Sequence, residues 1–185
     1  MLSVPRLGLT WEPEHPEALD GWIAWGRIAA VPFAFLEVGI ERGNYPPGDE
    51  RLAWALAAVF AAGALLFIRF PRLRAAGLAF DWAVVSAWVI LYSFEAGTPV
   101  RQLLLLPVVE AALRYGLRGG LLMPVLSLPA LVFFEWRQAV RLDLHPFDAG
   151  HIVGPVGIGL LAGVIVGALV ERLRLGSPPG SAGKR

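Results

Sequence analysis

The chain lacks cysteine altogether, and its charge is nearly balanced. With no cysteine among 185 residues, disulfide bridges and thiolate metal sites are excluded. The formal net charge of +1 argues against nucleic-acid binding, which usually shows a strong basic excess. The sequence also contains no Gly-rich phosphate loop, zinc-ligand motif or nucleophile elbow. We therefore expect neither catalytic activity nor a bound cofactor.

Charged residues are scarce and hydrophobic residues are abundant. Only 17% of the residues are charged, whereas 56% are hydrophobic. A soluble domain has roughly 45–50% apolar residues. This chain has too little polar surface to cover itself in water, so the composition predicts an integral membrane protein whose main partner is the lipid bilayer.

Apolar stretches long enough to cross a bilayer recur along the chain. A spanning helix needs about 20 mostly apolar residues, and the pattern predicts an all-α, polytopic membrane protein built as a six-helix bundle. The expected spans are residues 21–40, 52–70, 76–94, 100–115, 117–134 and 151–173. They form a transmembrane domain over residues 21–174, between a polar cytoplasmic lead-in (1–20) and a disordered Pro/Gly/Ser-rich cytoplasmic tail (175–185).

Lysine and arginine set the expected orientation, because short cytoplasmic loops carry an excess of both. One side of the predicted bundle carries ten of these residues and the other side five, with Arg27 inside the first span. The basic side includes the turn between the fourth and fifth spans, where Gly116 and the Gly119–Gly120 pair permit a tight reversal. We expect a multi-pass protein of the cell (inner) membrane with both termini in the cytoplasm.

Four charged residues fall inside the predicted spans at similar depth, in the half nearer the cytoplasm: Arg27, Asp81, Glu110 and Arg114. Ionisable groups at such depth are expensive and usually face the bundle interior. Glu110 and Arg114 stand four residues apart in the favourable order. We expect one intramembrane polar network with balanced charge. It either locks the helices together, senses a proton or ligand, or lines a transport path, and the sequence favours the structural lock.

The loop before the last span contains several side chains that are able to bind metal. Asp143, His145, Asp148 and His151 are spaced like ligands for zinc or a hard metal ion, but the spacing matches no known motif. The last three are the better candidates. The alternative is a solvated loop whose Asp148 caps the last helix. We assign no metal site from the sequence and keep these three residues as candidate ligands only.

Small residues line one face of the last span. Gly159, Gly163 and Gly167 recur every four residues, which is typical of a face that lets another helix approach closely. The partner is either a helix of the same bundle or the same span of a second subunit in a homodimer. Because this span leads directly into the cytoplasmic end of the chain, it is the natural output helix.

Two stretches resemble a known class of membrane region. "FDWAVVSAWVILYSFEAGTPVRQ" and "LLLLPVVEAALRYGLRGGLLMPVLSL" resemble the N-terminal multi-helix input regions of bacterial sensor histidine kinases and diguanylate cyclases. The shared scheme is an acidic span start, a short outer loop, a Leu/Pro-rich span and a basic inner turn. The residues that fit it are Asp81, Gly97, Thr98, Pro107, Arg114, Tyr115, Gly116, Arg118, Gly119 and Gly120.

This resemblance, which covers the third to fifth predicted spans, implies a sensory or anchoring module of a two-component or related signalling system. It also implies a cytoplasmic kinase or cyclase output domain as partner. The chain departs from the pattern after its last span, where "ERLRLGSPPGSAGKR" has no coiled-coil heptads. It contains neither a kinase histidine box nor a GG(D/E)EF motif, so we do not expect this chain by itself to be the enzyme.

Two other functions fit the sequence. One is the small-molecule-capturing component of a membrane transporter, and the other is a structural membrane scaffold. A polar pocket opening outward favours capture, whereas a tightly packed bundle without a pocket favours an anchor or scaffold. A neighbouring response-regulator gene supports signalling, and a neighbouring pair of ATPase genes supports transport.

Overall fold

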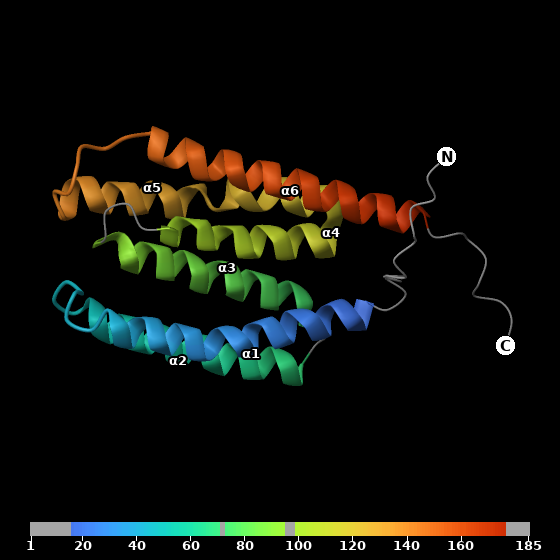
Figure 1. Ribbon diagram of the computed structural model, residues 1–185, viewed down its shortest axis with the longest axis horizontal. Helices are drawn as coiled ribbons and strands as arrows, with labels where there is room; N and C mark the ends of the chain where they lie inside the picture. Colours follow the sequence, from blue (N-terminus) through green and yellow to red (C-terminus); the bar gives the residue numbers. More distant parts are fainter. Residues whose placement is uncertain (1–15, 71–72, 95–98, 177–185) are drawn as a thin grey trace, which may run out of the picture.

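The computed structural model describes residues 16–70, 73–94 and 99–176, and within these ranges every regular element is a helix (Figure 1). The expected all-α class is confirmed. The long helices are α1 (Pro16–Ile40), α2 (Asp49–Arg69), α3 (Arg74–Leu91), α4 (Leu105–Leu126), α5 (Leu128–Trp136) and α6 (Gly150–Gly176). Two short 3-10 helices, η1 (Tyr92–Phe94) and η2 (Pro99–Leu104), lie between α3 and α4. A π-helical turn, η3 (Arg137–Arg141), extends α5.

The first and last long helices extend beyond the predicted spans. Helix α1 begins at Pro16, five residues before the predicted start at Gly21, and α6 continues to Gly176. The rest of the predicted lead-in and tail, residues 1–15 and 177–185, lies outside the described residues.

Five helical stretches of the described chain are long and apolar enough to cross a membrane: Gly21–Ile40, Asp49–Arg69, Ala75–Phe94, Arg101–Arg141 and Gly150–Leu173. Large apolar side chains cover their outer surfaces; Phe33, Leu65 and Ile165, for example, are 61%, 68% and 58% exposed. An apolar surface of this extent is unfavourable in water and suits a lipid environment. This one stretch, 101–141, holds the predicted fifth span and, apart from residue 100, the predicted fourth span.

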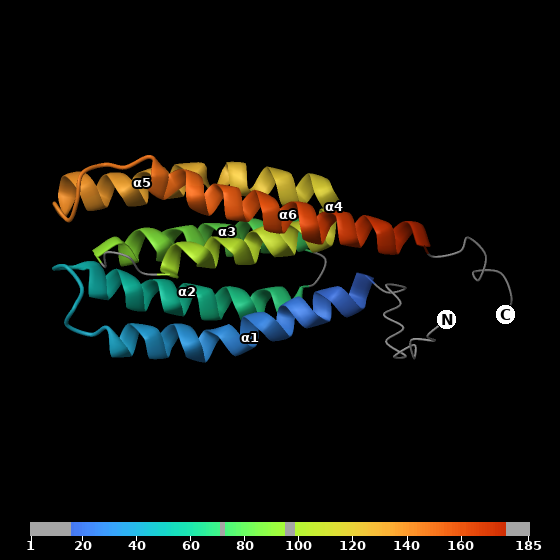
Figure 2. The same cartoon turned by 45° about the horizontal axis from the view of Figure 1, so that its top comes forward.

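The chain reverses direction inside α4, at Gly116 (Figures 1 and 2). The backbone angles of Gly116, φ 65° and ψ −148°, are accessible essentially only to glycine. Beyond this residue the chain returns beside itself, so that Gly119 lies against the carbonyl oxygen of Ala111. In an unbroken helix these two residues would be about 12 Å apart along the axis. Gly116 alone makes the predicted turn, whereas Gly119 and Gly120 are contact positions on the returning limb.

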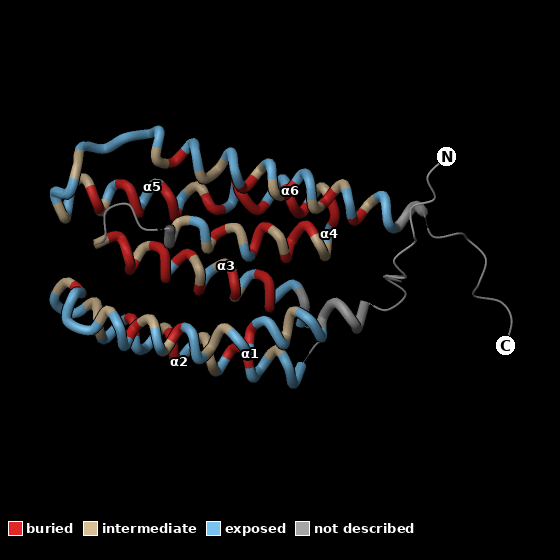
Figure 3. Tube along the Cα trace, in the orientation of Figure 1, coloured by how far each residue is buried: buried red, intermediate tan, exposed pale blue. Residues whose placement is uncertain are grey.

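The helices lie side by side along one direction (Figures 1 and 2). We call one end of the bundle the Gly116 end; it also holds the start of α1 and the end of α6. The other end, the His145 end, holds the loops 41–48 and 142–149. Helix α1 pairs with α2, α6 packs along α4, and α3 lies between these two pairs. Buried residues therefore concentrate along α3, α4 and α5, while α1, α2 and α6 face outward over much of their length (Figure 3).

An aromatic cluster closes the His145 end between α1, α2 and α3. The hydroxyl of Tyr45 donates a hydrogen bond to the hydroxyl of Tyr92 at 2.5 Å, and the ring of Trp88 stacks on that of Tyr92. Burial raises the pKa of Tyr45 above its usual value. Nearby, an ion pair between Asp49 and Arg137 joins the start of α2 to η3.

Candidate functional site

The structure brings all four charged residues expected at one depth into contact. Arg27 on α1 lies 2.6 Å from the Oδ2 atom of Asp81 on α3 and 3.2 Å from the Oε1 atom of Glu110 on α4. Glu110 Oε1 also accepts a hydrogen bond from Arg114 Nε at 2.9 Å, one helical turn further along α4. The side chains of these residues are at most 12% exposed. The network joins three helices with two positive and two negative charges.

The surroundings of Arg27 fix its guanidinium group. The ring of Phe67 on α2 lies 5.4 Å from it, which adds a cation–π contact from a fourth helix. On the α3 side it passes over Gly77, where a β-carbon would lie 3.0 Å from the guanidinium. Buried ion pairs of this kind are stable only while each charge keeps its partner. The network is therefore well suited to hold α1, α3 and α4 in one arrangement.

The glycine face of α6 packs inside the bundle. Gly163 meets Gly120 backbone to backbone, so closely that a β-carbon on either residue would overlap the carbonyl oxygen of the other. Gly167 lies against the backbone of Leu117, and Gly159 lies against the ring of Pro124. The three predicted positions thus serve the α4–α6 contact. A second subunit would have to meet another side of α6.

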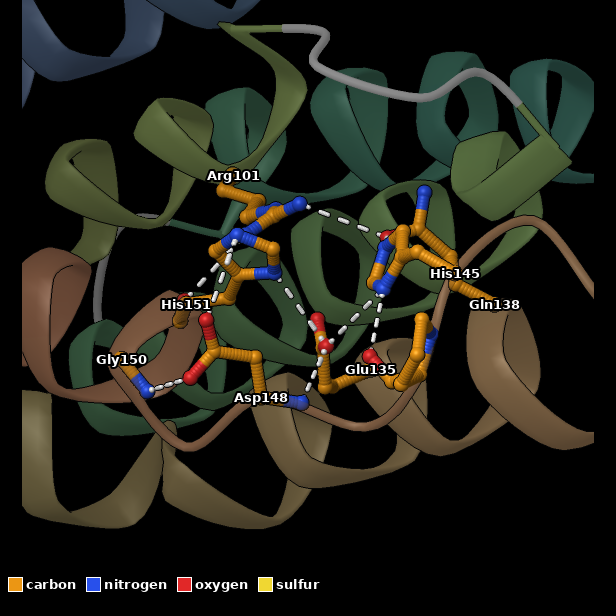
Figure 4. Close-up of polar contacts among 8 residues, drawn as sticks. Arg101, Glu135, Gln138, His145, Asp148, Gly150 and His151 are labelled. Carbon is orange, nitrogen blue, oxygen red and sulfur yellow. Dashed lines mark hydrogen bonds and ion pairs between the residues drawn. The ribbon is translucent and has the colours of Figure 1, made fainter.

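A second polar cluster, at the His145 end, forms around Glu135 near the end of α5 (Figure 4). This carboxylate is 1% exposed. Its Oε1 atom lies 3.2 Å from Nδ1 of His151 and 3.5 Å from Nδ1 of His145, and it accepts a hydrogen bond from the backbone N–H of Asp148 at 3.0 Å. The loop 142–149 folds back over α5 to bring the two histidines together.

Each ring in this cluster has a second polar neighbour. His145 Nε2 lies 3.1 Å from Oε1 of Gln138, and its Nδ1 atom lies 2.8 Å from the carbonyl oxygen of Pro146. His151 Nε2 lies 3.9 Å from Asp148 Oδ2. The Oδ1 atom of Asp148 accepts the backbone N–H of Gly150 at 2.8 Å, as expected of a residue that caps α6. Asp148 is thus at the edge of the cluster.

Arg101 on η2 connects this cluster to α6. Its Nη1 atom donates to the carbonyl oxygen of His151 at 3.2 Å, and its Nη2 atom donates to Gln138 Oε1 at 3.3 Å. The guanidinium also lies 4.6 Å from the centre of the Phe134 ring. Pro155 has no N–H to give to the carbonyl four residues earlier, which is that of His151. Arg101 supplies the donor that Pro155 lacks, and this holds the first turn of α6 against η2.

A cavity of about 380 Å³ lies beside Arg101, between η2, α4, α5 and α6. Its polar lining consists of Arg101, Gln102, Ser127 and His151, and the rest is mostly apolar. Small-molecule sites commonly have volumes of about 300–1,000 Å³ and combine an apolar lining with a few polar groups. The cavity is suited to a small amphiphilic molecule with a hydrogen-bond acceptor near Arg101.

His145, Asp148 and His151 are predicted from the sequence as candidate ligands, whereas Glu135 and Arg101 are not. Glu135 gave the same signal as Glu110, a carboxylate within an apolar segment, but its partners come from a loop whose path the sequence does not show. No protein-family model, curated protein or solved structure matches the chain. Its function is therefore inferred from the two polar clusters and the cavity.

Proposed function

We propose that the chain is the membrane-embedded sensory module of a bacterial signalling system, with the Gly116 end in the cytoplasm. A stimulus is received at the cavity of the His145 end and transmitted along α6. The observation that carries this proposal is the position of α6. It forms one wall of the cavity through residues 151–159, and at its other end Glu171 Oε1 accepts the backbone N–H of Leu117, beside the Gly116 turn, at 3.1 Å.

The proposal includes six membrane crossings, because each limb of the chain around Gly116 is long enough to cross. The six residues of η2 and the eleven of the limb 105–115 together extend about 28 Å, at about 2.0 Å and 1.5 Å per residue. The returning limb and α5, residues 117–136, extend about 30 Å at the same helical rise. The hydrocarbon core of a bilayer is about 30 Å thick.

The orientation follows from the basic residues at the Gly116 end. Four arginines lie on the last helical turns before this end or at the Gly116 turn itself: Arg69, Arg114, Arg118 and Arg172. Cytoplasmic ends carry such an excess. The cavity and the histidines then face the outside of the cell (inner) membrane, where an external stimulus arrives, and α6 ends in the cytoplasm, where a kinase or cyclase output domain would lie.

Tight packing supports transmission by α6 as a rigid body. Its glycines touch the backbone of the returning limb of α4, so one helix cannot shift without displacing the other. A change of position at the cavity is therefore expected to reach the Gly116 turn. A homodimer, if one forms through α6, would use the exposed residues Leu161, Ile165 and Leu169 rather than the glycines.

The cavity also supports a second function, capture of a small molecule for a membrane transporter. Both functions need an occupied cavity, but they differ in the cytoplasmic partner. Purification of the intact protein from its native membrane, with mass spectrometry of bound proteins and small molecules, tests both. A kinase, cyclase or response regulator supports signalling, and a pair of ATPases supports capture.

A matched pair of variants shows whether a bound molecule occupies the cavity. Leu105 lines it, whereas the adjacent Leu106 does not and is 61% exposed. We expect Leu105→Trp to abolish co-purification of the small molecule and Leu106→Trp to retain it. If both variants retain it, or if no small molecule co-purifies with the wild type, the cavity is not the receiving site.

A further inference from the structure

The loop 142–149 brings together a cluster of metal-binding side chains that the sensory function alone does not require. Glu135, His145 and His151 each offer one ligand atom, and the three atoms lie within 4.8 Å of one another. We propose that these three residues bind a divalent transition-metal ion, Zn²⁺ by preference. Two imidazoles and one carboxylate are a common zinc donor set, with a fourth position left for water or a ligand.

The distances between the donor atoms fit this ion. Zinc lies about 2.0–2.1 Å from nitrogen and oxygen ligands, so the donors of a tetrahedral site are about 3.3–3.4 Å apart. Glu135 Oε1 lies 3.2 Å from His151 Nδ1 and 3.5 Å from His145 Nδ1. Two of the three edges therefore already have the required length. To bind, His145 Nδ1 exchanges its contact with the Pro146 carbonyl for the ion.

The carboxylate of Glu135 supplies an independent observation. It is 1% exposed, and its Oε2 atom has no hydrogen-bond partner among the described residues. A buried carboxylate oxygen without a partner is costly, and a metal ion beside Oε1 would neutralise that charge. When both histidines are neutral, the cluster has one more negative charge than positive, because Glu135 and Asp148 face only Arg101. This excess favours binding of a cation.

Each ring has an oxygen atom near its other nitrogen, and that of His145 is within hydrogen-bond distance. A ligating histidine usually directs its other ring nitrogen at a carboxylate or carbonyl oxygen. His145 Nε2 faces the Gln138 side-chain oxygen, and His151 Nε2 lies near an oxygen of Asp148. The side chains of the two histidines are 23% and 42% exposed, so an ion from the aqueous side reaches them.

The metal site also touches the proposed sensor. His151 lines the cavity, and its carbonyl oxygen holds Arg101. Zinc would bind Glu135, His145 and His151 together and so tie the start of α6 to α5. A role of zinc as stimulus, or as a condition for ligand binding, rests on the proposed sensory function; the binding itself does not.

Titration of the tag-free protein in lipid nanodiscs with Zn²⁺, followed by calorimetry, tests the proposal. We expect one Zn²⁺ per chain, no comparable binding of Mg²⁺ or Ca²⁺, and at least about 10-fold weaker zinc binding in Glu135→Gln and in His145→Gln. The chain's third histidine, His15, provides the control, and His15→Gln should bind as the wild type does. Equal binding in all four proteins would overturn the site.

A second measurement covers the case in which a ligand variant does not fold. The wild-type protein is titrated with Co²⁺, whose visible bands are intense only in four- or five-coordinate sites. We expect these bands at one ion per chain and their loss on addition of Zn²⁺. A spectrum of hexahydrated Co²⁺ at every ratio contradicts the proposal. If Zn²⁺ binds but leaves the position of the cytoplasmic end of α6 unchanged, the metal site stands and zinc is not the stimulus.

Discussion

Removal of Arg27 should destabilise the bundle more than removal of Arg27 together with Asp81. Arg27→Met keeps most of the apolar stem but leaves Asp81 buried without its cation, since Arg27 is its ion-pair partner at 2.6 Å. Loss of one partner of a buried ion pair costs about 3–5 kcal/mol. In Arg27→Met/Asp81→Asn, the pair of Glu110 and Arg114 remains balanced, and an unsatisfied buried amide costs about 1–3 kcal/mol. We expect the double variant to be about 2 kcal/mol more stable than Arg27→Met.

The assay is reversible unfolding in mixed micelles with increasing sodium dodecyl sulfate, followed by the fluorescence of the chain's seven tryptophans. A double-mutant cycle with the single variant Asp81→Asn isolates the coupling. Arg42 provides the control, because its ion pair with Glu50 is on the surface and its side chain is 77% exposed. Arg42→Met should change the free energy of unfolding by at most about 0.5 kcal/mol. Additive effects of the two buried substitutions would refute the ion-pair network.

Three further predictions concern the backbone of α4 and α6. Gly163→Ala should lower the free energy of unfolding by about 1–3 kcal/mol because the added methyl group overlaps the facing helix. In the control Gly154→Ala the methyl group meets open space, and the free energy of unfolding should not fall. Equal losses in the two variants would contradict the close contact. Gly116→Ala should lower the free energy of unfolding by about 1–3 kcal/mol through backbone strain. The same detergent titration measures it, and an unchanged unfolding midpoint would mean that the turn tolerates a side chain. Arg101→Met should speed hydrogen exchange in the first turns of α6. Adding Pro155→Ala restores a backbone donor and should slow the exchange again. If exchange stays fast in the double variant, Arg101 does not replace the missing donor of Pro155.

The residues inside spans were the most predictable part of the molecule. Arg27, Asp81, Glu110 and Arg114 occupy similar places along apolar helices that run side by side, and buried charges need partners. The turn at Gly116 was also foreseen, although Gly119 and Gly120 turned out to serve helix packing. In each case, the position of a residue along an apolar helix sets its place along the bundle.

The cluster at the His145 end was predicted only in part, because its assembly depends on a loop and on irregular helices. Glu135 meets His145 and His151 only after the loop 142–149 folds back over α5. Arg101 reaches α6 because Pro155 leaves a carbonyl oxygen without its helical donor. Such contacts depend on tertiary packing, which neither hydropathy nor residue spacing encodes.

A distance measurement between α6 and α2 tests the central claim, that a change at the cavity moves α6 at the Gly116 end. Because the chain has no cysteine, spin labels attach only at cysteines introduced in place of Leu66 and Leu169, which are 48% and 57% exposed. Pulsed electron paramagnetic resonance then gives the distance between the two labels in three proteins: the one with an unmodified cavity, the Leu105→Trp variant and the control Leu106→Trp. We predict a shifted distance distribution in Leu105→Trp alone. Identical distributions in all three proteins would contradict transmission through α6.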